Sequence, residues 1–172
     1  VLPGVGAFGE GIKYLHNTGI AELIKYRVRK QKTPLLGICL GHQLLANFSE
    51  EQGQHNGLEL IRGKVIKIQS KEERIRVPNI GWHYTNIKKP SPLFPKKVKT
   101  EAFYFVHSFH FVCEDSMDVL AEIQYGGQSI VAAVSKDNVF GVQFHPEKSQ
   151  DAGLSMLKAF SKVVREYENG SR

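Results

Sequence analysis

A cysteine between two glycines, at the junction of an apolar run and a helical pattern, is the first feature of this sequence that suggests chemistry. Residues 37–41 read Gly-Ile-Cys-Leu-Gly, with Cys39 in the centre. A nucleophile on a sharp strand-to-helix turn is pushed out of the sheet, and flanking glycines avoid the clash that a Cβ would cause there. The helix that follows is expected to favour the thiolate and to present free N–H groups to an oxyanion. The competing interpretation is a buried structural cysteine between two packing glycines.

A histidine and a glutamate near the end of the chain supply the base that a cysteine nucleophile needs. His145 follows a predicted apolar strand, and it can take the thiol proton and later give it to a leaving amine. Glu147, two residues on, can accept a hydrogen bond from the other ring nitrogen and so fix the tautomer. The alternative is an ordinary histidine in a loop at a strand end. That is also our first interpretation of the other six histidines, His16, His42, His55, His83, His107 and His110.

Two predicted strands must place these residues at one edge of a sheet. The first, residues 34–38, is short and wholly apolar, as in a buried parallel strand, and residues 40–48 follow it as a predicted helix. The second, residues 139–144, ends directly before His145. Helical periodicity covers 10–31, with a break near Gly19, and 151–167. Turn signals separate further strand candidates at 64–68, 81–87, 102–106, 119–124 and 130–134. Together these elements predict one α/β domain with a mixed sheet.

Composition and charge narrow the classes of function. The 172 residues are 41% hydrophobic and carry 23 Lys and Arg against 17 Asp and Glu, a formal net charge of +6. The basic residues are scattered, apart from short clusters at 88–89 and 96–97, so we expect no nucleic-acid partner. No apolar run reaches the roughly 18 residues that span a membrane. Two cysteines favour a reduced, cytoplasmic setting over a disulfide framework. Neither zinc-like spacing nor a P-loop is present in the sequence, so we expect no metal and no cofactor.

Larger motifs around the cysteine and the histidine resemble the class I, triad-type glutamine amidotransferases. They are Gly-Ile-Cys-Leu-Gly-His-Gln-Leu-Leu at 37–45 and Gly-Val-Gln-Phe-His-Pro-Glu at 141–147, at a separation that also suits the family. Within that family, four more segments resemble the glutaminase subunits of imidazole glycerol phosphate synthase. They are Leu-Pro-Gly-Val-Gly-Ala-Phe-Gly at 2–9, Pro-Asn-Ile-Gly-Trp at 78–82, Phe-Tyr-Phe-Val-His-Ser at 103–108 and His-Pro-Glu-Lys-Ser at 145–149. The resemblance covers essentially the whole chain.

The resemblance implies a single class I amidotransferase domain over residues 1–172, with a central, largely parallel mixed sheet flanked by helices. The family begins with a strand-helix-strand segment before the Pro-Gly-Val-Gly loop at 3–6. This chain opens at Val1 without an initiator Met, so we expect that segment to be missing. The sequence departs from the family at His42, where Met is usual, and at Asn79 and His83, where His and Asn are usual.

The activity that the resemblance implies is hydrolysis of L-glutamine to glutamate and ammonia through a cysteine thioester. Cys39 is then the nucleophile, His145 the base and Glu147 the group that orients it. The loop before the first helix is implied to turn a backbone N–H into the oxyanion hole only when a partner is active. The implied substrate contacts are Gly6, Leu40, Gln43, Glu51, Ser108 and Phe109, and the implied oxyanion and loop residues are Gly4, Val5, Gly6 and Leu40.

The ammonia is implied to pass to a synthase subunit with a (β/α)8 barrel, in histidine biosynthesis. Trp82 and Lys148 match positions at the interface with that subunit, although core packing for Trp82 and plain solvation for Lys148 are the alternatives. The departures from the family leave a sugar-modifying synthase of a surface-polysaccharide pathway as another acceptor. A stand-alone γ-glutamyl or peptide hydrolase with the same triad, and a scaffold that only binds a synthase, are further alternatives.

Overall fold

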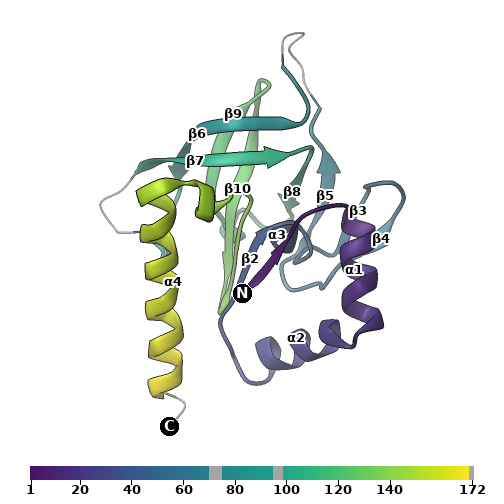
Figure 1. Ribbon diagram of the computed structural model, residues 1–172, viewed down its shortest axis with the longest axis vertical. Coiled ribbons are helices and arrows are strands. Elements are labelled where there is room, and N and C mark those ends of the chain that lie inside the picture. The colour runs from purple at the N-terminus through teal and green to yellow at the C-terminus, as the bar shows by residue number, and fades with distance from the viewer. Residues whose placement is uncertain (70–74, 95–98, 171–172) are drawn as a thin grey trace.

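The computed structural model describes residues 1–69, 75–94 and 99–170, and a seven-stranded mixed sheet runs through its centre (Figure 1). The basic cluster at 96–97 lies outside the described residues. A second, four-stranded sheet packs beside the first, in the order β4 (His55–Asn56), β3 (Phe48–Ser49), β5 (Gly63–Lys67) and β8 (Phe109–Cys113). The order in the seven-stranded sheet is β1 (Leu2–Gly4), β2 (Leu35–Cys39), β11 (Val139–Val142), β10 (Gln128–Lys136), β9 (Val119–Tyr125), β6 (Asn79–Ile87) and β7 (Thr100–His107).

The parallel part of the sheet is the part that carries the candidate catalytic residues. Strand β2 pairs in parallel with β1 on one side and with β11 on the other. The pairings β11–β10, β10–β9, β9–β6 and β6–β7 are all antiparallel. The expectation of a mixed sheet is confirmed, but the sheet is largely parallel only around β2. All five residues of β2 are buried, which accounts for its wholly apolar sequence.

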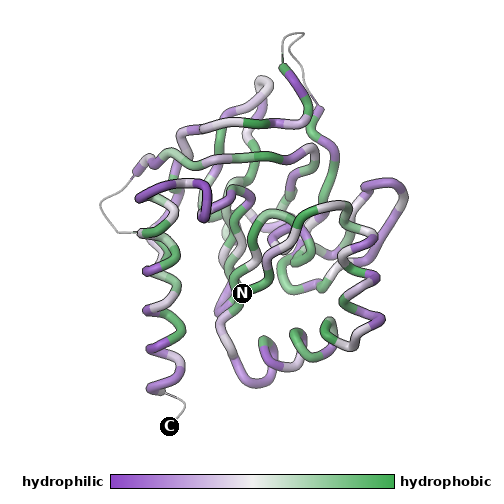
Figure 2. Tube along the Cα trace, in the orientation of Figure 1, coloured by the Kyte–Doolittle hydropathy of each residue, from purple (hydrophilic) through white to green (hydrophobic). Residues whose placement is uncertain are grey.

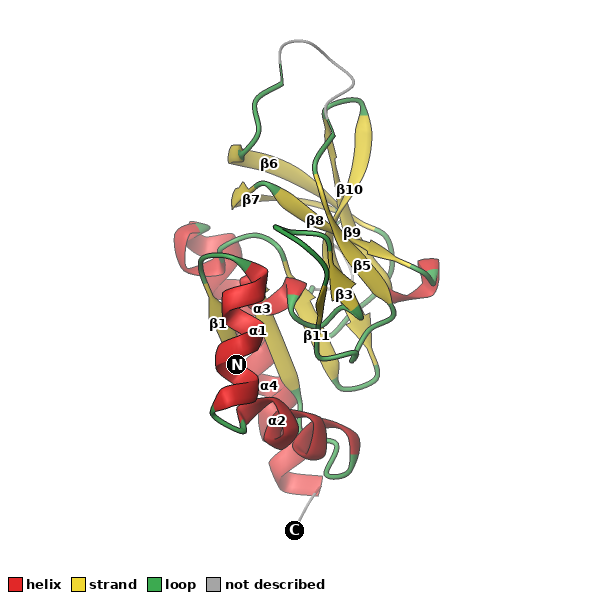
Figure 3. Cartoon of the chain, turned by 90° about the vertical axis from the view of Figure 1, so that its right-hand side faces the viewer, coloured by secondary structure: helices red, strands yellow, loops and turns green. Residues whose placement is uncertain are grey.

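Helices cover both faces of these parallel strands. Figure 1 shows α4 (Gln150–Gly170) on one side, with α1 (Phe8–Asn17) and α2 (Ile20–Arg29) on the other. In Figure 3, which is turned by 90°, the three helices overlap because one layer lies in front of the other. The predicted break near Gly19 is confirmed, because this residue stands between α1 and α2 with φ 72°. No described helix is both long and apolar enough to cross a membrane.

The hydrophobic core continues from α4 through the sheet to the strand end that precedes His145. Figure 2 shows apolar and polar segments alternating along α4, whose Met156 and Phe160 pack into the core. At the strand end, the ring of Phe144 stacks on Phe103 with centroids 3.9 Å apart and meets Phe105 edge to face. Aromatic pairs of this kind favour one relative orientation, so the core fixes the backbone just before His145.

The structure differs from the prediction most clearly at one helix and one strand. The helix expected over 40–48 is only α3 (Leu40–Gln43), because the chain turns into the small sheet, where Asn47 accepts a hydrogen bond from the Gly63 N–H and Phe48 enters β3. Strand β8 was not predicted. Only Ser108 separates β8 from β7, yet the two strands belong to different sheets.

Candidate active site

Cys39 lies where β2 ends and α3 begins, in a backbone conformation that is rare outside glycine. Its φ and ψ are 52° and −107°. A Cβ on Gly37 would lie 2.6 Å from the Gly41 carbonyl oxygen, and one on Gly41 would lie 1.7 Å from the Leu2 carbonyl oxygen. Both glycines are therefore required by close backbone approach, as the sequence predicts. Positive φ costs of order 1–3 kcal/mol for a non-glycine residue, so the packing around the turn must hold Cys39 in place.

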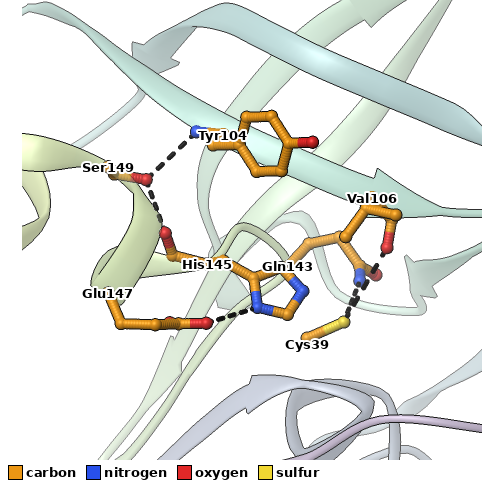
Figure 4. Close-up of polar contacts among 7 residues, drawn as sticks. All are labelled: Cys39, Tyr104, Val106, Gln143, His145, Glu147 and Ser149. Atoms are coloured by element: carbon orange, nitrogen blue, oxygen red, sulfur yellow. Dashed lines mark hydrogen bonds and ion pairs between the residues drawn. The ribbon is translucent and has the colours of Figure 1, made fainter.

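His145 is buried in the loop after β11, and both its backbone and its ring are held. The His145 N–H donates to the Tyr104 carbonyl at 2.9 Å. Ser149 Oγ donates to the His145 carbonyl at 2.6 Å and accepts from the Tyr104 N–H at 3.0 Å. The ring nitrogen Nδ1 meets Glu147 Oε1 at 2.7 Å, and Nε2 is buried without a hydrogen-bond partner among the described residues. Figure 4 shows Glu147 and Cys39 on opposite sides of this ring. Glu147 therefore leaves Nε2 free to act as the base on the cysteine side.

A pocket of about 310 Å³ brings most of the predicted site residues together. Gly4, Trp82 and Glu147 are not part of its lining. No three His, Cys, Asp or Glu side chains in the described part of the chain gather as a metal site requires. The lining residues singled out from the sequence are Val5, Gly6, Cys39, Leu40, Gln43, Glu51, Ser108, Phe109, His145 and Lys148, and the pocket adds Val106 and His107.

The thiol of Cys39 is protonated in the resting pocket. Burial, with a smaller contribution from the charge of Glu147, raises the pKa of Cys39 to about 11, although the Leu40 N–H lowers it in part. Sγ has two polar neighbours, Gln143 Nε2 at 3.9 Å and the Val106 carbonyl oxygen at 4.0 Å. The N–H at the start of α3 therefore favours the thiolate as expected, but burial of the thiol outweighs it. A four-residue helix contributes little macrodipole, and desolvation of the thiolate outweighs it.

We predict that iodoacetamide modifies Cys39 increasingly fast as the pH rises, by about tenfold per pH unit from 7 to 9, because only the thiolate reacts. The rate is measured by mass spectrometry in a Cys113→Ser background, which removes the second cysteine on β8. A rate that levels off near neutral pH would contradict a resting thiol and indicate a stable pair of thiolate and imidazolium.

Gln43 and Glu51 line the pocket but are already engaged in hydrogen bonds. Buried Gln43 donates from Nε2 to the Phe109 carbonyl at 2.9 Å and to Gln143 Oε1 at 3.0 Å. Glu51 Oε2 accepts from the Phe8 N–H at 2.7 Å, at the first residue of α1. Gln143 was not among the predicted site residues. It lies directly after β11 and two residues before His145, and this position is the signal that could have identified it.

His42 is a buried histidine whose ring has no hydrogen-bond partner at either nitrogen among the described residues. It packs against Phe111, with centroids 5.3 Å apart, and against Gly141, where a Cβ would lie 2.5 Å from Nδ1. Burial lowers the pKa of His42 from 6.5 to about 3. Between pH 6.5 and about 3, the unfolded chain therefore binds a proton at His42 that the folded chain excludes. The free energy of unfolding falls as the pH drops through this range.

We predict that His42→Met raises the free energy of unfolding by about 1–2 kcal/mol at pH 7. The substitution removes two unpaired buried polar atoms and puts an apolar side chain of similar length in their place. The fall in stability between pH 6.5 and 4 should also become shallower. It should not disappear, since burial lowers the pKa of His107 to about 4 as well. Urea unfolding at pH 7 and pH 5 measures both effects. Parallel pH profiles for the variant and the wild type would contradict the prediction.

Comparison with known proteins agrees with this geometry. Residues 1–163 match the family model of class-I glutamine amidotransferases. The chain is 41% identical to imidazole glycerol phosphate synthase subunit HisH 2 of Methanococcus maripaludis, over 94% of this chain and 79% of that protein. It is 45% identical to subunit HisH of Sulfurimonas denitrificans, over 94% of this chain and 78% of that protein. A solved glutamine amidotransferase, 20% identical, superposes over 91% of this chain and 76% of its own with a TM-score of 0.66, which supports the fold.

Proposed function

The chain belongs to the class-I glutamine amidotransferases and, within them, to the HisH subunits of imidazole glycerol phosphate synthase, and on that basis we propose that it is the glutaminase subunit of such a synthase. It hydrolyses L-glutamine to glutamate and ammonia, and it delivers the ammonia to the synthase in histidine biosynthesis. The observation that carries the proposal is one pocket lined by Cys39 and His145, with Glu147 hydrogen-bonded to the far nitrogen of the imidazole.

The imidazole of His145 takes up a proton and gives it away in each of the two halves of the reaction. As Cys39 Sγ attacks the carboxamide carbon of glutamine, its proton passes to His145 Nε2, and the carbonyl oxygen becomes an oxyanion. The imidazolium then gives that proton to the amine as the C–N bond breaks, which releases ammonia and leaves a γ-glutamyl thioester. Water attacks the thioester with His145 again as the base, and the thiol returns as glutamate leaves. Glu147 stabilises the imidazolium in both halves, because it accepts from Nδ1 at 2.7 Å.

Substrate binding is assigned to the rest of the pocket wall. Ser108 and Phe109 hold the α-amino and α-carboxyl ends of glutamine, and Gln43 and Glu51 contact the substrate further along the pocket. The Leu40 N–H, which already lowers the Cys39 pKa, is one oxyanion donor, and Gly6 supplies the other. Gly6 has φ 102° at the pocket wall, a conformation that glycine adopts without strain. Gly4 and Val5 set the path of the loop that carries it.

The synthase is proposed to dock on the outer face of β6. Ile80, Trp82 and Tyr84 alternate along this strand and are all exposed, which is uncommon for three large apolar side chains on one face. Trp82 is 47% exposed, so it is not a core residue. It meets Tyr104 edge to face, and the Lys148 ammonium lies 5.8 Å from the centre of the Tyr104 ring. Because Lys148 also lines the pocket, this face adjoins the place where ammonia is released.

The partner is proposed to be a (β/α)8-barrel subunit, as the family resemblance implies, and the complex to be cytoplasmic, which two unpaired cysteines favour. The proposal is tested by mixing the chain with such a subunit, its acceptor and amide-labelled glutamine. Labelled nitrogen should appear in imidazole glycerol phosphate. Labelled ammonia that is released but never transferred would indicate a stand-alone hydrolase, and binding without ammonia release would indicate a scaffold.

We predict that Trp82→Ala weakens synthase binding by about 30-fold or more, the cost of losing an aromatic hot spot at an interface. Tyr26→Ala is the matched control, because Tyr26 is an aromatic residue of similar exposure, 55%, on the distant helix α2. Dissociation constants from calorimetry check the difference. Equal affinities for the two variants would remove β6 from the interface.

A further inference from the structure

A line of polar side chains, partly exposed at His83 and buried beyond it, connects β6 with the wall of the glutamine pocket. His83 Nε2 lies 2.7 Å from Asn79 Oδ1, and Asn79 Nδ2 lies 3.1 Å from His107 Nε2. His107 Nδ1 lies 2.8 Å from the Phe109 carbonyl oxygen. Asn79 is fully buried and His107 is nearly so. The line therefore begins on the strand that carries Trp82 and ends in the pocket.

Every proton in this line has a determined position. A carbonyl can only accept, so His107 must carry its proton on Nδ1 and accept at Nε2 from the Asn79 amide. The Asn79 oxygen then accepts from His83, which must carry its proton on Nε2. Burial lowers the pKa of His107 to about 4, so the neutral form that this arrangement requires persists at neutral pH.

The Phe109 carbonyl, where this line ends, is shared with a second set of contacts that reaches the nucleophile. That oxygen also accepts from Gln43 Nε2, which donates in turn to Gln143 Oε1, and Gln143 Nε2 faces Cys39 Sγ at 3.9 Å. Removing any buried member leaves its neighbours unpaired, which costs more than a single hydrogen bond contributes.

Ser108 and Phe109 are the residues that most need such support. Ser108 is the only residue between β7, in the seven-stranded sheet, and β8, in the four-stranded sheet. On the β8 side of that crossing, the Ser108 carbonyl accepts from the Ile68 N–H at 2.9 Å. The hydrogen bond from His107 to Phe109 closes over Ser108 and ties the last residue of β7 to the first residue of β8.

We propose that Asn79 and His107, with His83 as the terminal donor, are positioning residues that set the Ser108–Phe109 segment for glutamine binding. The inference rests on the proposed function, because it assumes that this segment holds the substrate. None of the three acts on the reacting atoms. Breaking the line should therefore weaken the binding of glutamine while the chemical step at Cys39 proceeds at its normal rate.

The test uses the complex with the synthase subunit and two variants. Asn79→Leu removes both hydrogen bonds of the central residue and keeps a side chain of similar size. His83→Phe removes the terminal donor and keeps a ring against Phe105 and Tyr125, which His83 meets edge to face. Asn17→Leu is the control, because Asn17 is an exposed asparagine at the end of α1 that lines neither the pocket nor the proposed docking face.

Two readouts separate positioning from general damage. The first is KM against kcat for glutamine hydrolysis. The second is the protection of Cys39 from iodoacetamide by glutamine, which measures binding without turnover. For Asn79→Leu we expect KM and the protection constant to rise about tenfold, the loss of one to two hydrogen bonds. We expect kcat and the modification rate without glutamine to stay within about twofold, because Cys39 chemistry does not pass through Asn79. The control should match the wild type.

Unchanged protection in a folded Asn79→Leu variant would overturn the inference. If that variant does not fold, His83→Phe decides, with an expected rise of about threefold for the loss of one partly exposed hydrogen bond, and unchanged protection there would overturn it equally. A fall in kcat by the same factor as the rise in the protection constant would also overturn the inference. A wild-type protein that glutamine does not protect would overturn the proposed function and this inference with it, whereas protection retained in both variants overturns the inference alone.

Discussion

Cys39→Ala is expected to lower glutamine-dependent ammonia release by about 10³-fold or more, because the residual rate without the nucleophile comes only from binding and the oxyanion donors. The side chain lies on a strained turn that presents Sγ to the pocket. Cys113→Ala is the matched control, because Cys113 is the other free cysteine and does not line the pocket. Ammonia release in the complex with the synthase measures the effect.

His145→Ala should be nearly as damaging as Cys39→Ala, and the double variant should be no worse than either alone, since the two residues act as a unit. Glu147→Gln should keep the ring in place yet lose the stabilisation of the imidazolium, and its effect should be smaller. A Cys39→Ala protein that released ammonia at the wild-type rate would refute the assignment of the nucleophile. If the losses of rate in the two single variants multiplied in the double variant, Cys39 and His145 would act independently and not as a unit.

Gly6→Val is expected to lower the synthase-stimulated glutaminase rate by about 10²–10³-fold, the effect of losing one oxyanion donor. A Cβ at Gly6 would meet nothing within 4 Å, so the reason is conformational and not steric. A β-branched residue resists the φ of 102° that Gly6 adopts at the pocket wall. The basal rate, which the family resemblance implies to be weak, should change much less. That result would identify the loop at 3–6 as a switch that the synthase operates.

Gly19→Val is the control for Gly6→Val. Gly19 also has positive φ and open space around it, but it lies between α1 and α2, away from the pocket. The two variants should lose similar stability in urea unfolding, because both place a β-branched residue at positive φ. Only Gly6→Val should lose the stimulated rate. Equal losses of rate in both variants would make the effect one of folding, and equal rates with and without the synthase in the wild type would remove the switch.

The sequence predicts best where a local rule decides the structure. Gly37 is needed within the turn itself, where a Cβ would meet the Gly41 carbonyl, and Glu147 is two residues from His145, so the elbow and the acid-base pair follow from short-range patterns. The break at Gly19 is predicted for the same reason, because a single left-handed residue ends one helix before the next. These features do not depend on which elements pack against them.

Long-range packing decides the features that the sequence did not predict. The helical pattern after Leu40 stops at Gln43 because Phe48 joins the small sheet, and β8 pairs with β5 across 41 or more intervening residues. The protonated state of Cys39 depends on burial by distant residues, which no local motif reports. His107 was interpreted as an ordinary histidine, because its partners Asn79 and Phe109 lie on β6 and β8 and only the folded sheets bring all three together.

The most direct test of the central claim is to quench the protein with acid during glutamine turnover and to locate any covalent adduct by mass spectrometry. The predicted result is a γ-glutamyl group on Cys39, abundant while glutamine remains and absent once it is exhausted. His145→Ala should not form it at a comparable rate, because the thiol would keep its proton. Sustained ammonia release with no adduct on Cys39, or an adduct on Cys113 instead, would contradict the account.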